Sequence, residues 1–385
     1  MTKNASRTVR ALALSALLVL PFASAGAQSP DHPRNEVSGD RGWPAERAQL
    51  ISAAEQEGEL LLFSQPNRAA RDFLAREWAL AFPKIKLSIS AFPGDQLQVR
   101  MRTERNAGKY LWDLIFTGST IGFDLVKDGY IDPFLPELRD PDIAKPEIWG
   151  GWDEAFVDLD KKNVFSTNVA LKSPVYDALK LSPDKVRSAG LKILFDPALK
   201  EKIIWHEPNV PGPGAQFAFY LKNRLSDDEL RRFIVDQKVS FVAQQNQVIE
   251  ALARGTAWLG LGPGNSRALI DPYVKAGVNV DIRKFGNAPE LNDVTIGGST
   301  LFVVKNRPHP NTTRLFLNWL LSREVQAGFA KATEQNSRRV DVPSVADADG
   351  TPVPGAHYVS PQREENVRAL DAAVAFVGEV RKSIR

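Results

Sequence analysis

The alternation of helical and extended segments after residue 42 limits the fold more than any other feature of this sequence. Residues 43–58 (WPAERAQLISAAEQEG) have helical spacing and end at a glycine, and residues 59–67 (ELLLFSQPN) form an apolar run that leads into polar residues. The same alternation continues, with helical spacing in residues 68–83 and 95–108 and extended patterns in residues 84–92 and 110–120. Strands that alternate with helices predict an open, largely parallel α/β sheet.

A second α/β unit follows a proline-rich stretch. The chain has 385 residues, which is too long for one ordinary core and favours two lobes. Residues 164–174 (VFSTNVALKSP) carry few charges and predict a strand that crosses between the lobes. Residues 293–306 (DVTIGGSTLFVVKN) predict a return to the first lobe. Between these crossings we expect helices at residues 196–202, 215–225 and 239–255 and strands at residues 202–209 and 256–263.

The first residues have the pattern of a secretory signal peptide. Lys3, Arg7 and Arg10 precede an apolar run, and the small residues Ala25-Gly26-Ala27 follow it, so we expect cleavage after Ala27. An uncleaved anchor is the alternative, but the apolar run is short for a membrane span. The full chain has a formal net charge of +3, and loss of these three cations leaves 0. A neutral mature chain gives no electrostatic support for a nucleic-acid partner.

The chain contains no cysteine. An exported protein without disulfides depends on a large core for its stability, and it has no thiol to carry a lipid. We therefore expect a free protein in the periplasm. The expected organisation is a signal peptide at residues 1–27, a flexible leader at 28–42, a first lobe at 43–163 and 292–345, a second lobe at 164–291, and a helical C-terminal extension at 346–385.

Small polar residues at strand ends are the candidate binding residues, since ligands of such sheets bind beyond the carboxyl ends of the strands. In the first lobe these candidates are Ser64, Gln65, Asn67, Thr117, Gly118, Ser119 and Thr120. Ordinary turn chemistry explains the same residues equally well.

The second lobe carries a glycine-rich segment, residues 207–217 (EPNVPGPGAQF), before a predicted helix. Gly212 and Gly214 can bring backbone close to a ligand, and N–H groups at a helix start favour an anion, although a proline-rich turn is an equally simple explanation. The remaining candidates of this lobe and the crossing are Gln216, Asn265, Ser266 and Ser299. For the glycines and Ser299 beside the crossing, a structural role in the hinge is favoured over ligand contact.

Several segments together resemble the extracellular solute-binding proteins of bacterial ABC importers, in the branch that includes ferric-iron binders. They are residues 57–67 (EGELLLFSQPN), 105–119 (RNAGKYLWDLIFTGS), 251–262 (ALARGTAWLGLG), 296–326 (IGGSTLFVVKNRPHPNTTRLFLNWLLSREVQ) and 337–342 (SRRVDV). The resemblance implies a two-lobed periplasmic-binding-protein fold, with mostly parallel sheets, β hinge crossings and lobe closure on a solute. It also implies an inner-membrane ABC permease as partner, and we expect a monomer.

The ferric binders in this branch hold iron with neighbouring tyrosines in the segment that corresponds to residues 260–269. Here that segment reads GLGPGNSRAL and contains no tyrosine. Because Fe(III) requires anionic oxygen ligands, we expect neither iron nor another cofactor. A small polar solute with an anionic group fits the candidate residues better.

A secreted hydrolase that uses the interlobe cleft is the main alternative, and a sensor that presents its ligand to a receptor is another. The four histidines lie far apart in the sequence, and no nucleophile motif stands in a convincing context. His309 lies between Pro308 and Pro310 with no acid at a catalytic spacing, so a structural role at the start of a helix is favoured. The sequence therefore predicts a binding protein rather than an enzyme.

Overall fold

The computed structural model describes residues 43–64, 67–92, 94–210, 212–263, 266–296, 298–346, 350–353 and 355–384. The expected signal peptide and leader lie outside these residues. The first sheet has the order β2-β1-β3-β13-β4, with β5 also paired to β13. Its strands are β1 (Glu59–Ser64), β2 (Lys86–Ala91), β3 (Leu114–Thr117), β4 (Ile131–Asp132), β5 (Phe165–Ser166) and β13 (Thr300–Val304).

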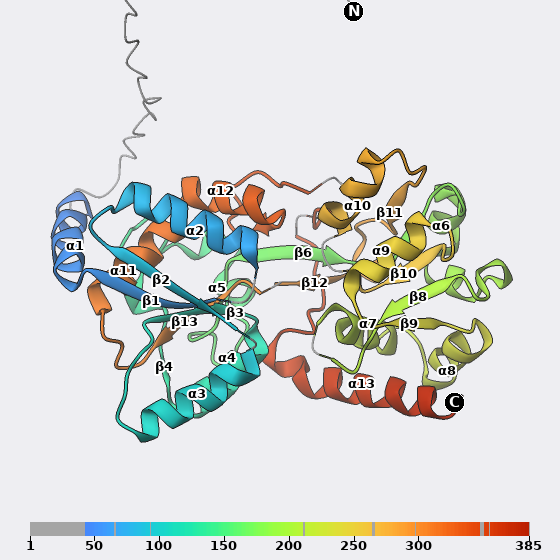
Figure 1. Cartoon of the computed structure of the whole chain (residues 1–385), viewed down its shortest axis with the longest axis horizontal. Coiled ribbons are helices and arrows are strands. Elements are labelled where there is room, and N and C mark those ends of the chain that lie inside the picture. Colours follow the sequence, from blue (N-terminus) through green and yellow to red (C-terminus); the bar gives the residue numbers. More distant parts are fainter. Residues whose placement is uncertain are drawn as a thin grey trace, which may run out of the picture. The chain divides into compact units, whose positions relative to one another are not determined.

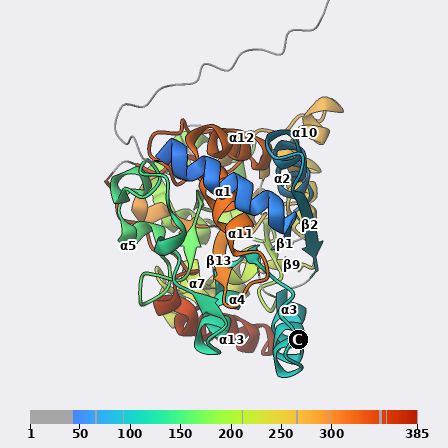
Figure 2. The same ribbon diagram turned by 90° about the vertical axis from the view of Figure 1, so that its left-hand side faces the viewer.

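Alternate residues of these strands face two helical layers, as the period of a strand requires. Leu62 and Leu301 belong to the core that also contains residues of four helices, α1 (Trp43–Glu57), α2 (Arg68–Ala81), α11 (Pro310–Leu320) and α12 (Arg323–Thr333). Phe63 and Phe302 belong to the opposite core, with residues of α3 (Gly94–Asn106) and α4 (Ser119–Lys127). Figure 2 shows α1 in front of α11 on the first of these faces.

The second sheet has the order β11-β7-β10-β8-β9. Its strands are β7 (Val175–Asp177), β8 (Ile203–His206), β9 (Ser240–Val242), β10 (Leu259–Leu261) and β11 (Ile282–Lys284). One face packs on α7 (Pro213–Lys222), α8 (Asp227–Asp236) and α13 (Val367–Lys382). The other packs on α9 (Gln245–Ala253) and α10 (Ser266–Lys275). The second lobe also contains α6 (Pro183–Ala189).

The chain passes between the sheets through a small third sheet, in which β6 (Asn168–Lys172) pairs antiparallel with β12 (Asp293–Thr295) and β14 (Asn336–Ser337). β6 links β5 of the first sheet to β7 of the second, and β12 leads back to β13 (Figure 1). The predicted two-lobed α/β fold with β crossings is confirmed. Both sheets are mixed, because β13 and β7, the strands beside the crossings, run antiparallel to their neighbours β3 and β10.

The C-terminal segment contacts both lobes. Ala373, Val377 and Val380 of α13 belong to the core of the second lobe. Just before this helix, the Glu364 backbone N–H donates to the Val157 carbonyl of the first lobe at 2.9 Å. No helix among the described residues is long and apolar enough to cross a membrane.

Two helix predictions were wrong in detail. Residues 196–202 form only one 3-10 turn, Pro197–Leu199, because Glu201 takes a left-handed φ of 62° before β8 begins. Residues 239–255 divide into strand β9 and helix α9, since three residues at the sheet edge pair with β8. A helix does begin after His309, as expected; it ends at Leu320, and a separate helix starts after Ser322.

His309 is the N-cap residue of α11, and the structure supplies the acid that the sequence did not place beside it. Asp113 is completely buried and accepts hydrogen bonds from the Leu61 N–H at 2.7 Å and the His309 N–H at 2.7 Å. His309 Nδ1 lies 2.8 Å from the same carboxylate. Burial raises the pKa of Asp113, although these donors oppose the rise. The arrangement ties α11 to β1, in agreement with a structural role for His309.

We expect Asp113→Ala to lower the free energy of unfolding by about 2–4 kcal/mol, because it leaves buried donors without an acceptor. Urea unfolding followed by circular dichroism measures this change. Asp72→Ala is the matched control, since that exposed carboxylate pairs with exposed Arg68 and should change stability by less than about 0.5 kcal/mol. Equal stability of the two variants would contradict the structural role of Asp113.

Candidate functional site

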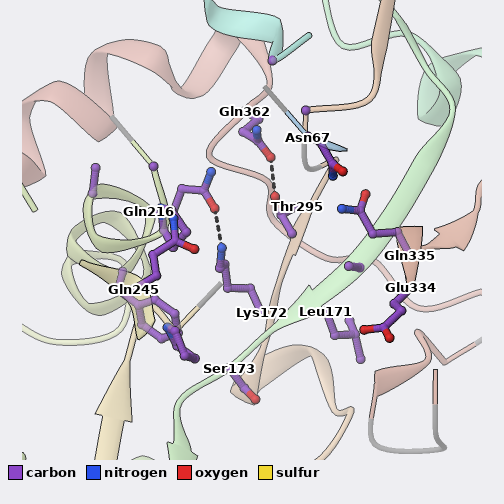
Figure 3. A pocket seen from close by; sticks show the side chains of 18 of the residues that line it. Asn67, Leu171, Lys172, Ser173, Gln216, Gln245, Thr295, Glu334, Gln335 and Gln362 are labelled. Atoms are coloured by element: carbon purple, nitrogen blue, oxygen red, sulfur yellow. Dashed lines mark hydrogen bonds between the residues drawn. The ribbon is translucent and has the colours of Figure 1, made fainter. Parts of the chain in front are cut away.

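A pocket of about 790 Å³ lies where the crossing strands meet the ends of strands from both sheets. Its walls include residues at or beside the starts of helices α2, α4, α7 and α9. The volume suits a small organic molecule rather than a bare ion. Figure 3 shows polar side chains of several different elements converging on this space.

Lys172, the last residue of crossing strand β6, is the central cation of the pocket. Its Nζ donates to Gln216 Oε1 at 2.9 Å (Figure 3). The pKa of Lys172 is lowered to about 7, mainly by burial and also by the nearby charge of Lys284, while Asp293 opposes the shift. A desolvated ammonium with a neutral partner attracts an anion strongly, because an anion would replace the lost hydration.

Asp293 does not neutralise Lys172, because it already has a cationic partner. Asp293 faces Lys172 across the β12–β6 pair and is almost completely buried. Its carboxylate lies 2.7 Å from the Arg224 guanidinium. Burial raises the pKa of Asp293 to about 6 despite this ion pair.

The start of α7 forms the wall beside Lys172. Gly212 is its N-cap residue, with φ 139°, and no side chain caps this helix. His206 holds the first turn of this helix in place, because its Nδ1 accepts a hydrogen bond from the Gly214 N–H at 3.0 Å. A Cβ atom at Gly214 would lie 2.2 Å from the His206 carbonyl oxygen, so this position requires glycine. Pro213 has no N–H and the Gly214 N–H is engaged by His206, so the start of α7 contributes the partial positive charge of a helix N-terminus beside the lysine.

Two helix starts of the first lobe face the same pocket. Asn67 caps α2 through Oδ1, which accepts from the Ala70 N–H at 3.1 Å. The carboxamide oxygen is therefore engaged, and the NH₂ group is a donor. Gly118 is the N-cap residue of α4, again without a side-chain cap. Both ends favour negative charge by the same helix-terminus effect as α7.

Gln362 contributes a pocket residue from the C-terminal segment. Its Oε1 accepts from Thr295 Oγ1 at 2.5 Å and from the Ile296 N–H at 2.9 Å (Figure 3). Its carbonyl oxygen accepts from Ser119 Oγ at 2.6 Å. The pocket wall at the start of α4 is thus joined to the crossing strand β12.

The predicted site residues divide into three groups. Those that line the pocket are Asn67, Thr117, Gly118, Thr120, Gly212 and Gln216. Those that are buried outside its lining are Ser64, Ser119, Gly214 and Ser299. Those outside the described residues or side chains are Gln65, Asn265 and Ser266. Solute contact remains a prediction for the first and third groups. The proposed site does not include the buried group.

Sequence reasoning missed several lining residues: Lys172, Gln245, Lys284, Glu334, Gln335, Asn336 and Gln362. Lys172 left one detectable signal, because it is the one charged residue in the crossing segment VFSTNVALKSP. Gln245 was hidden by the incorrect prediction of one long helix over residues 239–255. The others lie in or beside strands and helices, at positions that show no distinctive spacing.

The described residues contain no group of three or more histidine, cysteine, aspartate or glutamate side chains placed to hold a metal ion. The pocket lining, within that same part of the chain, includes two lysines and one glutamate and no tyrosine. Cations close to a metal oppose its binding, and Fe(III) requires hard anionic ligands. The residues of this pocket therefore do not fit an iron site.

Comparison with known structures shows the same fold at low sequence identity. Iron-bound HitA from Pseudomonas aeruginosa aligns with a TM-score of 0.60 and 15% identity, over 84% of this chain and 99% of that one. Trichodesmium FutA (IdiA), in complex with iron and citrate, gives 0.60 and 16%, over 84% and 99%. Agrobacterium tumefaciens AgtB, with agropinic acid, gives 0.54 and 18%, over 84% and 98%. These matches include both iron and organic ligands.

No match was found among curated proteins. The model of the family described as bacterial extracellular solute-binding protein matches residues 65–327, which is more than half of the chain. This range contains β6, the helix starts around the pocket and the strand that returns to the first lobe. The chain therefore belongs to the bacterial extracellular solute-binding proteins, the family that binds solutes for ABC importers.

Proposed function

We propose that this protein captures a small polar solute with an anionic group and delivers it to an inner-membrane ABC permease. The position of Lys172 carries this proposal. Its ammonium lies in the pocket between helix starts α4 and α7, and its described hydrogen-bond partner is a neutral amide. An anion would supply the missing counter-charge and interact with the positive ends of both helices at the same time.

Lobe closure follows from where the donors are attached. Asn67 and Gly118 belong to the first lobe, Gly212 and Gln216 to the second, and Lys172 to a strand between them. A solute that bonds to both sets has a higher affinity for a state in which they are closer together. Binding therefore selects a closed conformation. The crossing strands absorb the change at their ends.

Iron is a weaker candidate for this chain, although HitA and FutA are iron-bound in the aligned structures. At this level of identity the similarity supports the fold alone. The two pocket lysines, Lys172 and Lys284, oppose a trivalent cation. Agropinic acid in AgtB shows that the fold also holds an organic acid.

We also propose that the chain is exported with cleavage after Ala27 and acts as a periplasmic monomer. Its second lobe boundary lies at residues 291/292, while the first, expected at 163/164, lies after β5, because β5 pairs with β13 in the first sheet. The C-terminal extension would begin at residue 346. The family consists of binding proteins, which favours binding without turnover. A sensor that presents the solute to a receptor would use the same pocket. Deletion of the permease separates these uses: it should abolish uptake of the solute if the protein acts in transport, and it should leave the response to the solute intact if the protein acts as a sensor.

A thermal-shift panel of carboxylates, phosphate esters, neutral sugars and metal ions tests the proposed function. A ligand at about 100 times its Kd adds about 2.7 kcal/mol of stability. We expect stabilisation by anions and none by sugars or Fe(III). For the best anion, Lys172→Met should weaken binding at least 100-fold, while Lys180→Met, a change at an exposed lysine of the same lobe, should leave it unchanged.

The same Lys172→Met variant should melt at a higher temperature than the wild type without ligand at pH 6. Lys172 has a folded pKa of about 7, below the ordinary value of a lysine. The folded state therefore binds this proton less well than the unfolded state, which costs stability below pH 7 and less as pH rises. Calorimetry at pH 6 measures the change. A lower melting temperature would contradict the desolvation of Lys172.

Affinity for the anion should fall as pH rises above 7, because the charged form of Lys172 is the form that binds it. With a pKa of about 7 in the free protein, binding at pH 8.5 should be roughly 30-fold weaker than at pH 6. Isothermal titration in two buffers of different ionisation enthalpy should show proton uptake at pH 8. The ligand for this titration should not itself ionise between pH 6 and pH 8.5, so that any proton taken up on binding belongs to the protein. An affinity independent of pH would oppose this role.

Asn67→Asp separates capping from solute binding. A carboxylate caps a helix about as well as a carboxamide, so the melting temperature should change by less than about 2 °C. The donor that faces the pocket becomes a negative charge, so the affinity for an anion should fall at least tenfold. Asn67→Ser, which retains a neutral cap, should lose less affinity than Asn67→Asp. Tighter anion binding by Asn67→Asp would refute the assignment.

A further inference from the structure

The pocket is lined by carboxamides whose oxygens are already bonded to the protein. Asn67 Oδ1 accepts from the Ala70 N–H at 3.1 Å, and Gln216 Oε1 accepts from Lys172 Nζ at 2.9 Å. Because an N–H donor requires the oxygen of a carboxamide, each bond fixes which end of the side chain is which. The NH₂ groups of Asn67 and Gln216 form no hydrogen bond within the described part of the chain. Both are therefore donors for a solute.

Asn336, of crossing strand β14, is the most firmly held of these carboxamides. Its Oδ1 accepts from Ser344 Oγ at 2.8 Å, from the Val345 N–H at 3.0 Å and from the Ala346 N–H at 3.1 Å. The residue lines the pocket, and only 6% of its surface is exposed. Its NH₂ group has no protein acceptor among the described residues and is not one of the fully buried unpaired groups there. The pocket is therefore where these N–H groups find an acceptor.

The donors lie at two ends of the pocket. Asn336 pairs with Val169 of β6, and Lys172 lies three residues farther along the same strand, which corresponds to about 10 Å. Figure 3 shows Asn67 and Gln335, the residue before β14, across the space from Lys172. A solute whose anionic group lies at Lys172 therefore presents a different part of its body to Asn67 and Asn336.

Resting on the proposed function, we propose that Asn67 and Asn336 bind a second group of the solute through their NH₂ groups. That group is a hydrogen-bond acceptor, such as a carbonyl oxygen, several bonds away from the anionic group. An ammonium or N–H group at the same place would meet donors, because the oxygens of both carboxamides are engaged. Asn336 is then a specificity-determining residue, and the solute is an organic acid of the oxo-acid type.

Glu334 is the pocket residue that favours the opposite choice. It lines the pocket two residues before Asn336 in the chain, and a carboxylate attracts an ammonium group. A solute with an amino group would bind towards Glu334, whereas a solute with an oxo group would bind towards Asn67 and Asn336. A comparison of oxo acids with their amino analogues decides between these two choices.

Matched sets of carboxylic acids test the second group at pH 7.0 by calorimetric titration. The oxo acids 4-oxopentanoate, 5-oxohexanoate and 6-oxoheptanoate are each compared with the unsubstituted parent acid and with the analogue that carries an amino group in place of the oxo group. Size and the carboxylate stay nearly constant within a set. In at least one set we expect the oxo acid to bind about tenfold more tightly than its parent, and the amino analogue to bind less tightly than the parent.

Asn336→Asp assigns the preference to this residue. The new carboxylate still accepts from Ser344, Val345 and Ala346, but the donor that faces the pocket becomes a negative charge. The oxo acid should then bind about tenfold more weakly, and the amino analogue should bind more tightly than the oxo acid. Asn67→Asp should shift the ratio of the two affinities in the same direction.

Ser344→Ala is the matched control, because it removes one bond to Asn336 Oδ1 and leaves the NH₂ group in place. It should keep the wild-type ratio within about threefold, since the lost bond does not face the solute. Melting temperatures of the free variants confirm that each is folded.

An amino analogue that binds the wild-type protein as tightly as its oxo acid in every set would overturn the acceptor group. A ratio that neither Asn336→Asp nor Asn67→Asp changes would overturn the roles of these residues. Oxo acids that do not bind, or that bind no better than their parents, would overturn the acceptor group too, while the proposed anion binding would stand. Failure of every anion in the thermal-shift panel, with a neutral or cationic compound stabilising the protein instead, would overturn the proposed function as well.

Discussion

The ammonium of Lys172 in the strand between the two lobes is the interaction on which the proposed site depends. Several buried charges among the described residues have a partner of opposite sign. Arg339, for example, is almost completely buried, and its guanidinium bonds to Asp142 at 2.8 Å and to Asp341 at 2.7 Å. Lys172 instead donates to the neutral Gln216 Oε1, and no carboxylate of the described chain forms an ion pair with it. Folding thus leaves at the pocket a charge that a solute can satisfy.

The rest of the fold positions donors around this charge. Helix α11 is attached to the first lobe through Asp113 and through Glu57, whose carboxylate accepts from the Asn311 and Thr312 N–H groups. In the second lobe, His206 fixes the start of α7. These bonds hold elements within a lobe. The C-terminal segment joins the lobes, because Gln362 bonds to Ser119 and Thr295 while α13 packs on the second lobe.

The sequence allowed the fold to be predicted more fully than the site. Long periodic segments such as residues 43–58 and 68–83 folded as expected, because their apolar residues recur with the period of a helix and not with that of a strand. Residues 239–255 did not, since a three-residue edge strand (β9) is too short to show a period of two. Gln362 could not be placed, because a residue more than 240 positions from Ser119 reaches the pocket only through tertiary packing. Lys172 was visible as a lone charge in an apolar strand, yet its desolvation depends on the assembled walls.

A crystal structure of the protein with its natural solute, purified from the source bacterium, is the most direct test of the anion site. The account predicts acidic oxygens of the solute within hydrogen-bond distance of Lys172 Nζ and beside the N-terminal end of α7. A solute that places a neutral or cationic group against Lys172, or that binds away from this pocket, would contradict it.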